Sequence, residues 1–367
     1  MKTVKTPIKP NLTTYPYEKL GNLQDILFMD IETTGFSPDS SVLYLIGCAY
    51  IEDGIFNVIQ WMAENYDEEE AVLYAFYNFA SSYKKLVHFN GNHFDIPFMS
   101  SRIEELDLPF DLRIFEGIDI YKRLKPYKEF LKLQSLKQRS IEEYMGLERE
   151  DTLGGMELVN ATNEYLQTGD EDIASTLLLH NLDDLKGLVG IVPMLAVTDL
   201  FTENIRVTKA GRNPYTDADG IARSEVIMEL ALPSPLPVPV SYGWSDCYFT
   251  GEGTRGKLRV SVYQGELKYF YPNYKEYYYL PDEDVAVHKS VAAYVDPSKR
   301  ENAKASNCYT KKCGIFLPQW DPLFSPVLRQ AYKEPTMYFE LTDEFKHDPK
   351  RFATYAKHLL QMLVTPY

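Results

Sequence analysis

Cysteine is scarce in this sequence, and so are long apolar runs. Four cysteines among 367 residues cannot form the disulfide framework of a small secreted protein, which favours a reducing compartment. The longest apolar runs, at 42–51 and 187–197, are shorter than the roughly 20 residues that a membrane-spanning helix needs. The first 21 residues have no apolar centre of the kind found in signal peptides. We therefore expect a cytoplasmic protein that does not contact a membrane.

Two further absences narrow the range of functions. The glycine patterns of P-loops and dinucleotide-binding folds are missing. Basic charge is scarce in the first half, where residues 1–200 contain 17 Lys and Arg against 33 Asp and Glu, whereas residues 201–367 contain 21 against 20. An acidic surface repels phosphate groups unless metal ions or a local basic stripe intervene. Any nucleic-acid chemistry in the first half therefore requires one of these two features.

The first half shows the alternation of strands and helices that is typical of an α/β fold. Residues 26–32 are apolar on both faces until acids appear, which predicts a central strand buried on both sides. Strands at 42–51 and 55–62 follow, joined by Asp53-Gly54, a strong hairpin-turn signal. The pattern then predicts strands at 86–89 and 114–121 and helices at 67–83, 94–106, 136–145 and 173–200. A mixed sheet with helices on its faces accommodates this order.

The second half differs from the first in its pattern of apolar residues and prolines. A chain of this length is expected to form two domains. We predict an amphipathic helix at 217–232, an extended stretch at 233–239 where proline occupies every second position, and a hairpin at 257–271 that turns near Gln264-Gly265. Residues 348–364 resemble a closing helix. The predicted organisation is an N-terminal extension (1–24), a first domain (25–202), a helix and proline-rich linker (203–244) and a smaller α+β domain of unknown role (245–367).

Two carboxylates end the predicted central strand. Asp30 and Glu32 are two residues apart, so both side chains project from one face of the strand. Their mutual repulsion favours a cation between them, and their hard oxygen ligands suit Mg²⁺ or Mn²⁺. Acids that merely begin a surface loop are the alternative.

Two later segments place further acids near predicted strand and helix ends. Asp95 follows the strand at 86–89, where an aspartate could simply cap a helix. His180 and Asp184 are one helical turn apart and share a face, although a lone helical histidine is more often structural than catalytic. Asp183 would point about 100° away around the helix and is the weaker candidate.

Taken together, the three motifs Asp30-x-Glu32, Asn90-x3-Phe94-Asp95 and His180-x3-Asp184 resemble those of the DEDD 3′–5′ exonucleases. More narrowly, residues 25 to about 200 resemble the bacterial YprB-type ribonuclease-H-like domain. The resemblance covers about half the chain and implies a ribonuclease-H-like mixed five-stranded sheet flanked by helices. The supporting stretches are Gln60-Trp61, 133–137, 148–151, Gly154-Gly155 and 165–170.

This resemblance implies a site and a reaction. Asp30, Glu32, Asp95 and Asp184 would hold two divalent cations, Mg²⁺ or Mn²⁺, that promote in-line displacement at phosphorus. His180 would orient or deprotonate the attacking water. Thr33, Asn90 and Phe94 would contact the nucleic acid.

The third motif departs from the family pattern. DEDD enzymes have either a tyrosine with three residues before the last aspartate or a histidine with four, whereas this chain has His180 with three. One helical turn still places His180 on the same face as Asp184.

A single dense basic stretch lies between the second and third motifs. Its cations begin with Lys122, Arg123, Lys125 and Lys128, and they alternate with tyrosines, as in a surface that follows a nucleic-acid backbone. A solvated helix face is an equally good interpretation.

The second half offers less specific signals. The aromatic run at 269–279 is better explained by the core of a small sheet than by a base-stacking surface. Cys308 and Cys313 have no second pair of ligands, so a zinc site there is not expected.

Two functions remain open from the sequence. The favoured one is a metal-dependent 3′–5′ exonuclease that acts on the 3′ end of DNA or RNA. The alternative is a catalytically weak or inactive nucleic-acid-binding or scaffold protein on the same fold. Retention of Asp30, Glu32, Asp95 and Asp184 favours the enzyme.

Overall fold

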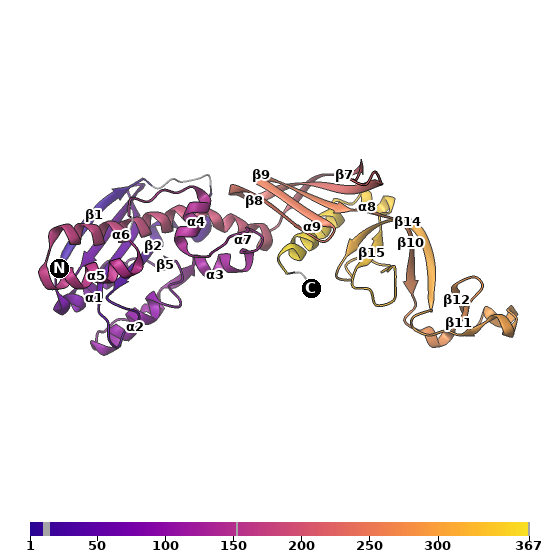
Figure 1. Ribbon diagram of the computed structural model, residues 1–367, viewed down its shortest axis with the longest axis horizontal. Helices are drawn as coiled ribbons and strands as arrows, with labels where there is room; N and C mark the ends of the chain where they lie inside the picture. The colour runs from indigo at the N-terminus through magenta and orange to yellow at the C-terminus, as the bar shows by residue number, and fades with distance from the viewer. Residues whose placement is uncertain (10–14, 152, 366–367) are drawn as a thin grey trace. The chain divides into compact units, whose positions relative to one another are not determined.

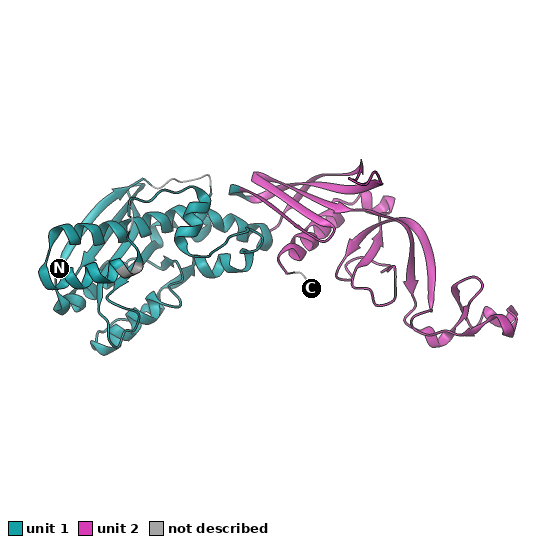
Figure 2. Ribbon diagram, viewed as in Figure 1, with its two compact units in different colours: residues 1–202, 234–238 teal, residues 203–233, 239–367 magenta. Residues whose placement is uncertain are grey.

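The computed structural model describes residues 1–9, 15–151 and 153–365, which form two compact units. Unit 1 comprises residues 1–202 together with 234–238, and unit 2 comprises residues 203–233 and 239–367 (Figure 2). The boundary at residue 202 lies where the sequence pattern changes from alternating strands and helices to the proline-containing second half. The five residues 234–238 belong to unit 1 although they lie within a strand that otherwise belongs to unit 2.

Unit 1 is built on a six-stranded mixed sheet in the order β1-β4-β3-β2-β5-β6. Figure 1 shows this sheet together with the helices of the unit. The first four strands in this order pair antiparallel, whereas β2, β5 and β6 pair parallel. The strands are β1 (Lys2–Ile8), β2 (Ile26–Thr33), β3 (Leu43–Glu52), β4 (Ile55–Met62), β5 (Lys85–His88) and β6 (Glu116–Asp119).

The α/β prediction is confirmed, and the sheet has one strand more than expected. Residues 2–8, predicted as part of an extension, pair with β4 from Lys2–Met62 to Ile8–Phe56. Their alternation of half-buried and exposed side chains is that of an edge strand. The predicted hairpin is present, because Asp53 and Gly54 adopt the left-handed conformations, φ 51° and 78°, that a two-residue turn requires.

Seven α-helices accompany this sheet in the described part of unit 1. The predicted segments correspond to α1 (Glu69–Ala80), α2 (Asp95–Glu105), α4 (Gln138–Met145), α6 (Glu171–Ile191) and α7 (Leu195–Thr202), whereas α3 (Ile120–Leu124) and α5 (Gly155–Thr168) were not predicted. Gly169 ends α5 at φ 69°, and the Asp170 side chain then accepts hydrogen bonds from the first backbone N–H groups of α6.

Helix α6 is the central helix of the unit and packs against β2 and β3. The helical stretch Glu171–Thr202 is long and apolar enough to cross a membrane by length and composition alone. However, 72% of its most apolar 18-residue segment is buried inside the structure. This burial is that of a core helix.

Unit 2 contains three three-stranded sheets and two α-helices among its described residues. The sheets are β7 (Arg206–Thr216), β8 (Ala222–Trp244) and β9 (Cys247–Ser261); β10 (Tyr263–Phe270), β14 (Tyr309–Gln319) and β15 (Met337–Glu340); and β12 (Val285–His288), β11 (Tyr277–Leu280) and β13 (Glu301–Asn302). The helices are α8 (Asp343–Lys346) and α9 (Pro349–Val364), the latter as predicted.

Two secondary-structure predictions in this half are wrong. The segment 217–232 forms a turn and most of β8 instead of a helix, since its buried residues alternate from Ser224 to Leu236 with the period of a strand. The proline-rich stretch continues that alternation and is extended, as predicted. Gln264 and Gly265 lie inside β10, opposite Ile315 and Gly314, because the chain changes sheets at Val262 instead of turning back.

Candidate active site

Two of the expected acids lie on the central strand β2, between antiparallel β3 and parallel β5. Met29 and Ile31 point into the core on the opposite face and are buried. Asp30 and Glu32 therefore share the remaining face. Asp30 is partly buried, and Glu32 is 8% exposed.

The space beside Asp30 depends on a glycine in the neighbouring strand. Gly47 pairs with Asp30 in the sheet, and a Cβ atom there would lie 2.0 Å from the Asn181 Oδ1 atom of α6. The gap admits Asn181, which donates to Asp30 Oδ2 at 2.9 Å and accepts from Gln60 Nε2 at 2.9 Å. A buried amide pair thus fixes the orientation of the Asp30 carboxylate.

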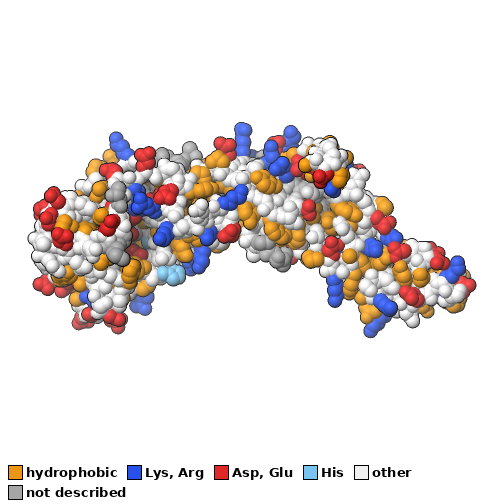
Figure 3. Space-filling view, viewed as in Figure 1, with side chains coloured by type: hydrophobic (Ala, Val, Ile, Leu, Met, Phe, Trp, Pro, Cys, Tyr) orange, Lys and Arg blue, Asp and Glu red, His pale blue; other side chains and the backbone are white. Residues whose placement is uncertain are grey.

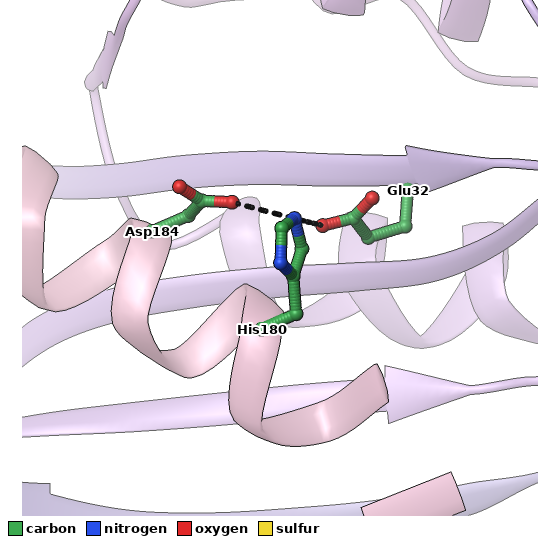
Figure 4. A group of neighbouring side chains, drawn as sticks. All are labelled: Glu32, His180 and Asp184. Atoms are coloured by element: carbon green, nitrogen blue, oxygen red, sulfur yellow. Dashed lines mark ion pairs between the residues drawn. The ribbon is translucent and has the colours of Figure 1, made fainter. Parts of the chain in front are cut away.

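Helix α6 brings the third motif over this strand. The His180 imidazole lies between the carboxylates of Glu32 and Asp184 (Figure 4). Its Nε2 atom is 3.2 Å from Asp184 Oδ2 and 3.7 Å from Glu32 Oε1. The unusual three-residue spacing therefore still places the ring between two acids from different elements.

Asp95 is the first residue of α2 and follows the loop after β5. Its carboxylate accepts a hydrogen bond from the backbone N–H of Ile31, between the two acids of β2. Asp95 is 7% exposed, and it is close enough to Asp30 and Glu32 for its charge to raise the pKa of both. Its contacts therefore extend beyond its own helix, to the strand that carries the first motif.

The four carboxylates disfavour one another's ionisation. Burial raises the pKa of Asp30 and of Glu32 well above the ordinary values, and the charges of Asp184 and Asp95 add to the rise in both. Burial likewise raises the pKa of Asp95 to about 7 and also raises that of Asp184, although Arg149 and His180 oppose the rise at Asp184. Such a cluster is stabilised by added positive charge.

A divalent cation fits this donor set. Glu32, His180 and Asp184 offer ligand atoms that all lie within 4.8 Å of one another. Carboxylate oxygens suit Mg²⁺ and Mn²⁺, whereas an imidazole nitrogen suits transition metals better than it suits Mg²⁺. The geometry therefore supports a metal centre at the meeting point of β2 and α6.

Several polar side chains that no sequence motif indicated surround the site. The Arg149 guanidinium donates to Asp184 Oδ1 at 2.7 Å and also pairs with Glu142 of α4. Asp151 Oδ2 lies 2.7 Å from His180 Nδ1. Both residues lie in the 148–151 stretch that carried part of the family resemblance. Glu142 is 1% exposed and Asp151 is 4% exposed. An acid that is so buried needs a partner, and this burial, which the sequence does not reveal, is the signal that points to both residues.

The expected nucleic-acid contacts from the first two motifs lie at turns beside the acids. Thr33 Oγ1 donates to Gly35 O at 2.7 Å, which stabilises the turn after β2. Asn90 has φ 62°, and its backbone N–H donates to Asp119 Oδ1 at 3.0 Å. The Phe94 ring packs edge-on against Phe36, which is 90% exposed.

The basic stretch begins next to the second motif. Asp119, which holds the Asn90 loop, also accepts from the backbone N–H of Lys122 as the N-cap of α3. Lys122, Arg123 and Lys125 are exposed, Lys128 is half-buried, and none of these four forms an ion pair with another residue in the described ranges. They lie on α3 and around the short 3₁₀ helix that follows, Lys125–Tyr127.

The two remaining cysteines of interest give no second metal site. Cys308 is buried and Cys313 is exposed on β14, and neither belongs to a metal-holding cluster among the residues that the structure describes. The aromatic run at 269–279 is only partly in a core, since most of its rings are half-buried.

The comparison with protein families agrees with the fold of unit 1. Residues 27–196 match the family model described as RNase_H superfamily. No curated protein sequence matches the chain. Among solved structures, the chain is similar to the family B DNA polymerase of Pyrobaculum calidifontis (21% identity, TM-score 0.39, 48% of this chain and 25% of that one).

The chain is also similar to E. coli exonuclease I. A zinc-bound complex of that protein with single-stranded DNA gives 12% identity and a TM-score of 0.29 over 57% of this chain and 55% of that one. A complex of exonuclease I with a dT13 oligonucleotide gives 11% identity and a TM-score of 0.28 over 56% of this chain and 54% of that one. This chain therefore spans about a quarter to about half of the proteins that it resembles. The family match defines the fold of the first unit: residues 27–196 of this chain form a domain of the RNase H superfamily.

Proposed function

We propose that this chain is a metal-dependent 3′–5′ exonuclease that hydrolyses phosphodiester bonds of DNA or RNA. The observation that carries the proposal is the convergence of Asp30, Glu32, Asp95 and Asp184 from β2, α2 and α6, with His180 Nε2 facing two of them. Burial and the charges of the neighbouring acids raise the pKa of Asp30 and Glu32, and such a cluster favours bound cations. A metal-dependent reaction requires such a cluster of acids, whereas the stability of the fold does not require it.

The residues divide into two roles. Asp30, Glu32, Asp95 and Asp184 would hold two Mg²⁺ or Mn²⁺ ions, which would supply positive charge opposite the phosphate oxygens and assist attack by water. His180 would orient the attacking water and accept its proton at Nε2, the ring atom that faces the acids. Asn181 keeps the Asp30 carboxylate oriented toward this centre.

The surroundings suit a nucleic-acid end. Phe36 and Phe94 present apolar rings next to the acids, where a terminal base could stack. Acidic side chains gather over the end of unit 1 that carries β1, α1 and α2 (Figure 3). Lys122, Arg123, Lys125 and Lys128 would therefore supply the local positive charge for the phosphate backbone.

One observation supports the alternative, a catalytically weak or inactive nucleic-acid-binding protein. Arg149 already pairs with Asp184 and so partly neutralises the acid cluster without a metal ion. An arginine in that position lowers the electrostatic gain from binding a second cation.

A gel assay with 5′-labelled DNA and RNA, single- and double-stranded, tests the proposal directly. Purified protein with Mg²⁺ or Mn²⁺ is expected to shorten the substrate progressively from its 3′ end. The Asp30→Ala variant should leave it intact. If the substrate stays full-length in every wild-type lane and its band shifts in a native gel, the result would contradict the exonuclease proposal and support the nucleic-acid-binding alternative.

Calorimetry with Mn²⁺ tests the metal centre independently of activity. We expect two binding events in the wild type and their loss or strong weakening in Asp30→Asn. Asp53→Asn is the matched control, because Asp53 lies exposed in the β3–β4 turn and asparagine suits the same left-handed conformation. Equal Mn²⁺ binding by both variants would contradict the assignment of Asp30.

A further inference from the structure

The loop between α4 and α5 is fixed to the middle of α6 by its backbone. The N–H groups of Glu150 and Asp151 both donate to Asp183 Oδ2, at 2.7 and 2.8 Å. Asp183 is 3% exposed, and Lys186 Nζ lies 3.0 Å from its other oxygen. Asp183 therefore binds this loop, while its neighbour Asp184 faces the acid cluster.

This attachment places two side chains of the loop beside the third motif. Arg149 reaches Asp184, and Asp151 reaches His180, so both residues of His180-x3-Asp184 have a partner on the same short segment. Asp151 is 4% exposed, and its Oδ1 atom accepts from the backbone N–H of Leu153 at 3.0 Å. Its Oδ2 atom is thus the one left for the imidazole.

The bond between Asp151 and His180 has a defined consequence for the ring. A carboxylate can only accept, so a contact of 2.7 Å to Nδ1 requires that Nδ1 carries a hydrogen. The lone pair of the neutral ring then lies on Nε2, which faces Glu32 and Asp184. The opposite tautomer would direct an N–H group into the acid cluster and offer no base there.

We propose that Asp151 is a positioning residue that fixes the tautomer and orientation of His180 and thereby leaves Nε2 free to accept a proton. The proposal rests on the exonuclease function and assigns a role to a residue outside the three acidic motifs.

The substitution Asp151→Asn tests this role with little change in shape. The carbonyl oxygen of the introduced side chain can keep the bond to the Leu153 N–H, which leaves its amide NH₂ facing His180 Nδ1. The amide then donates, and the neutral ring must carry its hydrogen on Nε2 instead. Asp172→Asn, an exposed change of equal charge in the first turn of α6, is the matched control.

The tautomer is read by ¹⁵N NMR of the full chain with labelled histidine, in the metal-free state and with Mg²⁺. The chain has six histidines, and His180→Ala identifies the relevant signals. At a pH where the ¹⁵N shifts show a neutral ring, the wild type and Asp172→Asn should have a protonated Nδ1. Asp151→Asn should have a protonated Nε2. An unchanged tautomer in a folded Asp151→Asn protein would overturn the proposal.

Kinetics give the second measurement. With the nucleic acid that the wild type degrades, Asp151→Asn should lower kcat by about 10²–10⁴-fold, the range of general-base catalysis, and leave KM and Mn²⁺ affinity nearly unchanged. A rise in KM alone, or a loss explained by a lower melting temperature, would assign Asp151 a purely structural role. If the wild type degrades nothing, the exonuclease proposal fails, while the NMR result still decides whether Asp151 sets the tautomer.

Discussion

At the scale of single residues, the acids of the site act against the stability of the metal-free fold. Each is buried or partly buried near others of the same charge, and the Arg149 guanidinium pairs with Asp184 alone among the four. The Asp30 carboxylate accepts a hydrogen bond from the neutral amide of Asn181 and forms no ion pair with any residue that the structure describes. Removing the charge of Asp30 should therefore abolish the activity without lowering the stability of the metal-free protein.

We expect Asp30→Ala to abolish hydrolysis, by at least about 10³-fold, and to keep or raise the melting temperature in EDTA, because it removes a repelling charge. Parallel nuclease assays and thermal melts check this. Asp53→Ala, at an exposed turn, should leave the activity unchanged. A large fall in the metal-free melting temperature of Asp30→Ala would argue for a structural role of this acid.

Asp95 makes the stability of the metal-free protein depend on pH. Its pKa is raised to about 7 in the fold, so the folded state binds this proton more tightly than the unfolded chain does. The stabilisation from the protonated form is fully present below the ordinary aspartate pKa, near about 4, and is lost as the pH rises through about 7. The melting temperature in EDTA should fall between about pH 5 and pH 8.

The same melts in Mn²⁺ provide the comparison. Bound cations should remove most of that fall, and the Asp95→Asn variant should show a flatter pH dependence without metal. A melting temperature that is constant or rises over this window in EDTA would be inconsistent with the raised pKa that burial and nearby acids give Asp95.

At the scale of elements, the site depends on how closely α6 approaches the sheet. A Cβ atom on Gly47 would lie 2.0 Å from Asn181 Oδ1 and 2.6 Å from Leu185 Cδ1, both on α6. We expect Gly47→Ala to move α6 away from β3, to lower stability by about 1–3 kcal/mol and to reduce activity more than substrate binding. Chemical denaturation and steady-state kinetics measure these effects.

Gly211→Ala is the matched control for this change. Gly211 also lies in a strand, β7, and a Cβ atom there would meet nothing within 4 Å. Equal losses in the two variants would show that the effect at position 47 comes from the backbone and not from the approach of α6.

Helix α3 and the turn after it should contribute to binding but not to the chemical step. Replacing Lys122, Arg123 and Lys125 together by alanine should raise KM, leave kcat nearly unchanged and reduce the salt dependence of binding. Replacing Lys346, Lys350 and Lys357 together by alanine, at exposed positions on α8 and α9, controls for the loss of three positive charges. An unchanged KM and salt slope in the α3 variant would favour the solvated-face interpretation of this stretch.

The elements differ in how well their sequence predicted them. Strand β2, the Asp53-Gly54 hairpin and α6 follow from local patterns, since apolar periodicity and turn chemistry are encoded within a few residues. The segment 217–232 was mistaken for a helix because its alternation of buried residues becomes clear only with the proline-rich continuation of β8. The contacts of Arg149 and Asp151 with α6 join residues 35 and 29 positions apart in the sequence, and no local signal encodes them.

At the scale of the whole molecule, the two units share one strand. Residues 234–238 of β8 belong to unit 1, where Ser234 is 1% exposed and hydrogen-bonds with Asp199 and with Lys19, the latter at 2.6 Å. Leu236 is 5% exposed in the same stretch. Unit 1 therefore includes packing contributed by a segment that lies beyond residue 202.

We expect Leu236→Asp to destabilise unit 1 in particular, because it places a charge in a buried apolar position. Hydrogen exchange should become faster in β2, β3 and β4 and change little in β10 and β14. Leu323→Asp, at a residue that is 36% exposed, is the control. Faster exchange confined to unit 2 would show that β8 stabilises only the second unit.

The shared strand also bears on how such a chain can be shortened or recombined. A gene fragment that ends at codon 202 encodes every acid of the site but omits the five residues of β8 that complete the unit around them. Fusing the first 202 residues to another protein would therefore transfer the acid cluster without part of the packing around it. A fragment that is meant to keep unit 1 whole has to carry β8 with it, and with β8 the two strands that pair with it, β7 and β9.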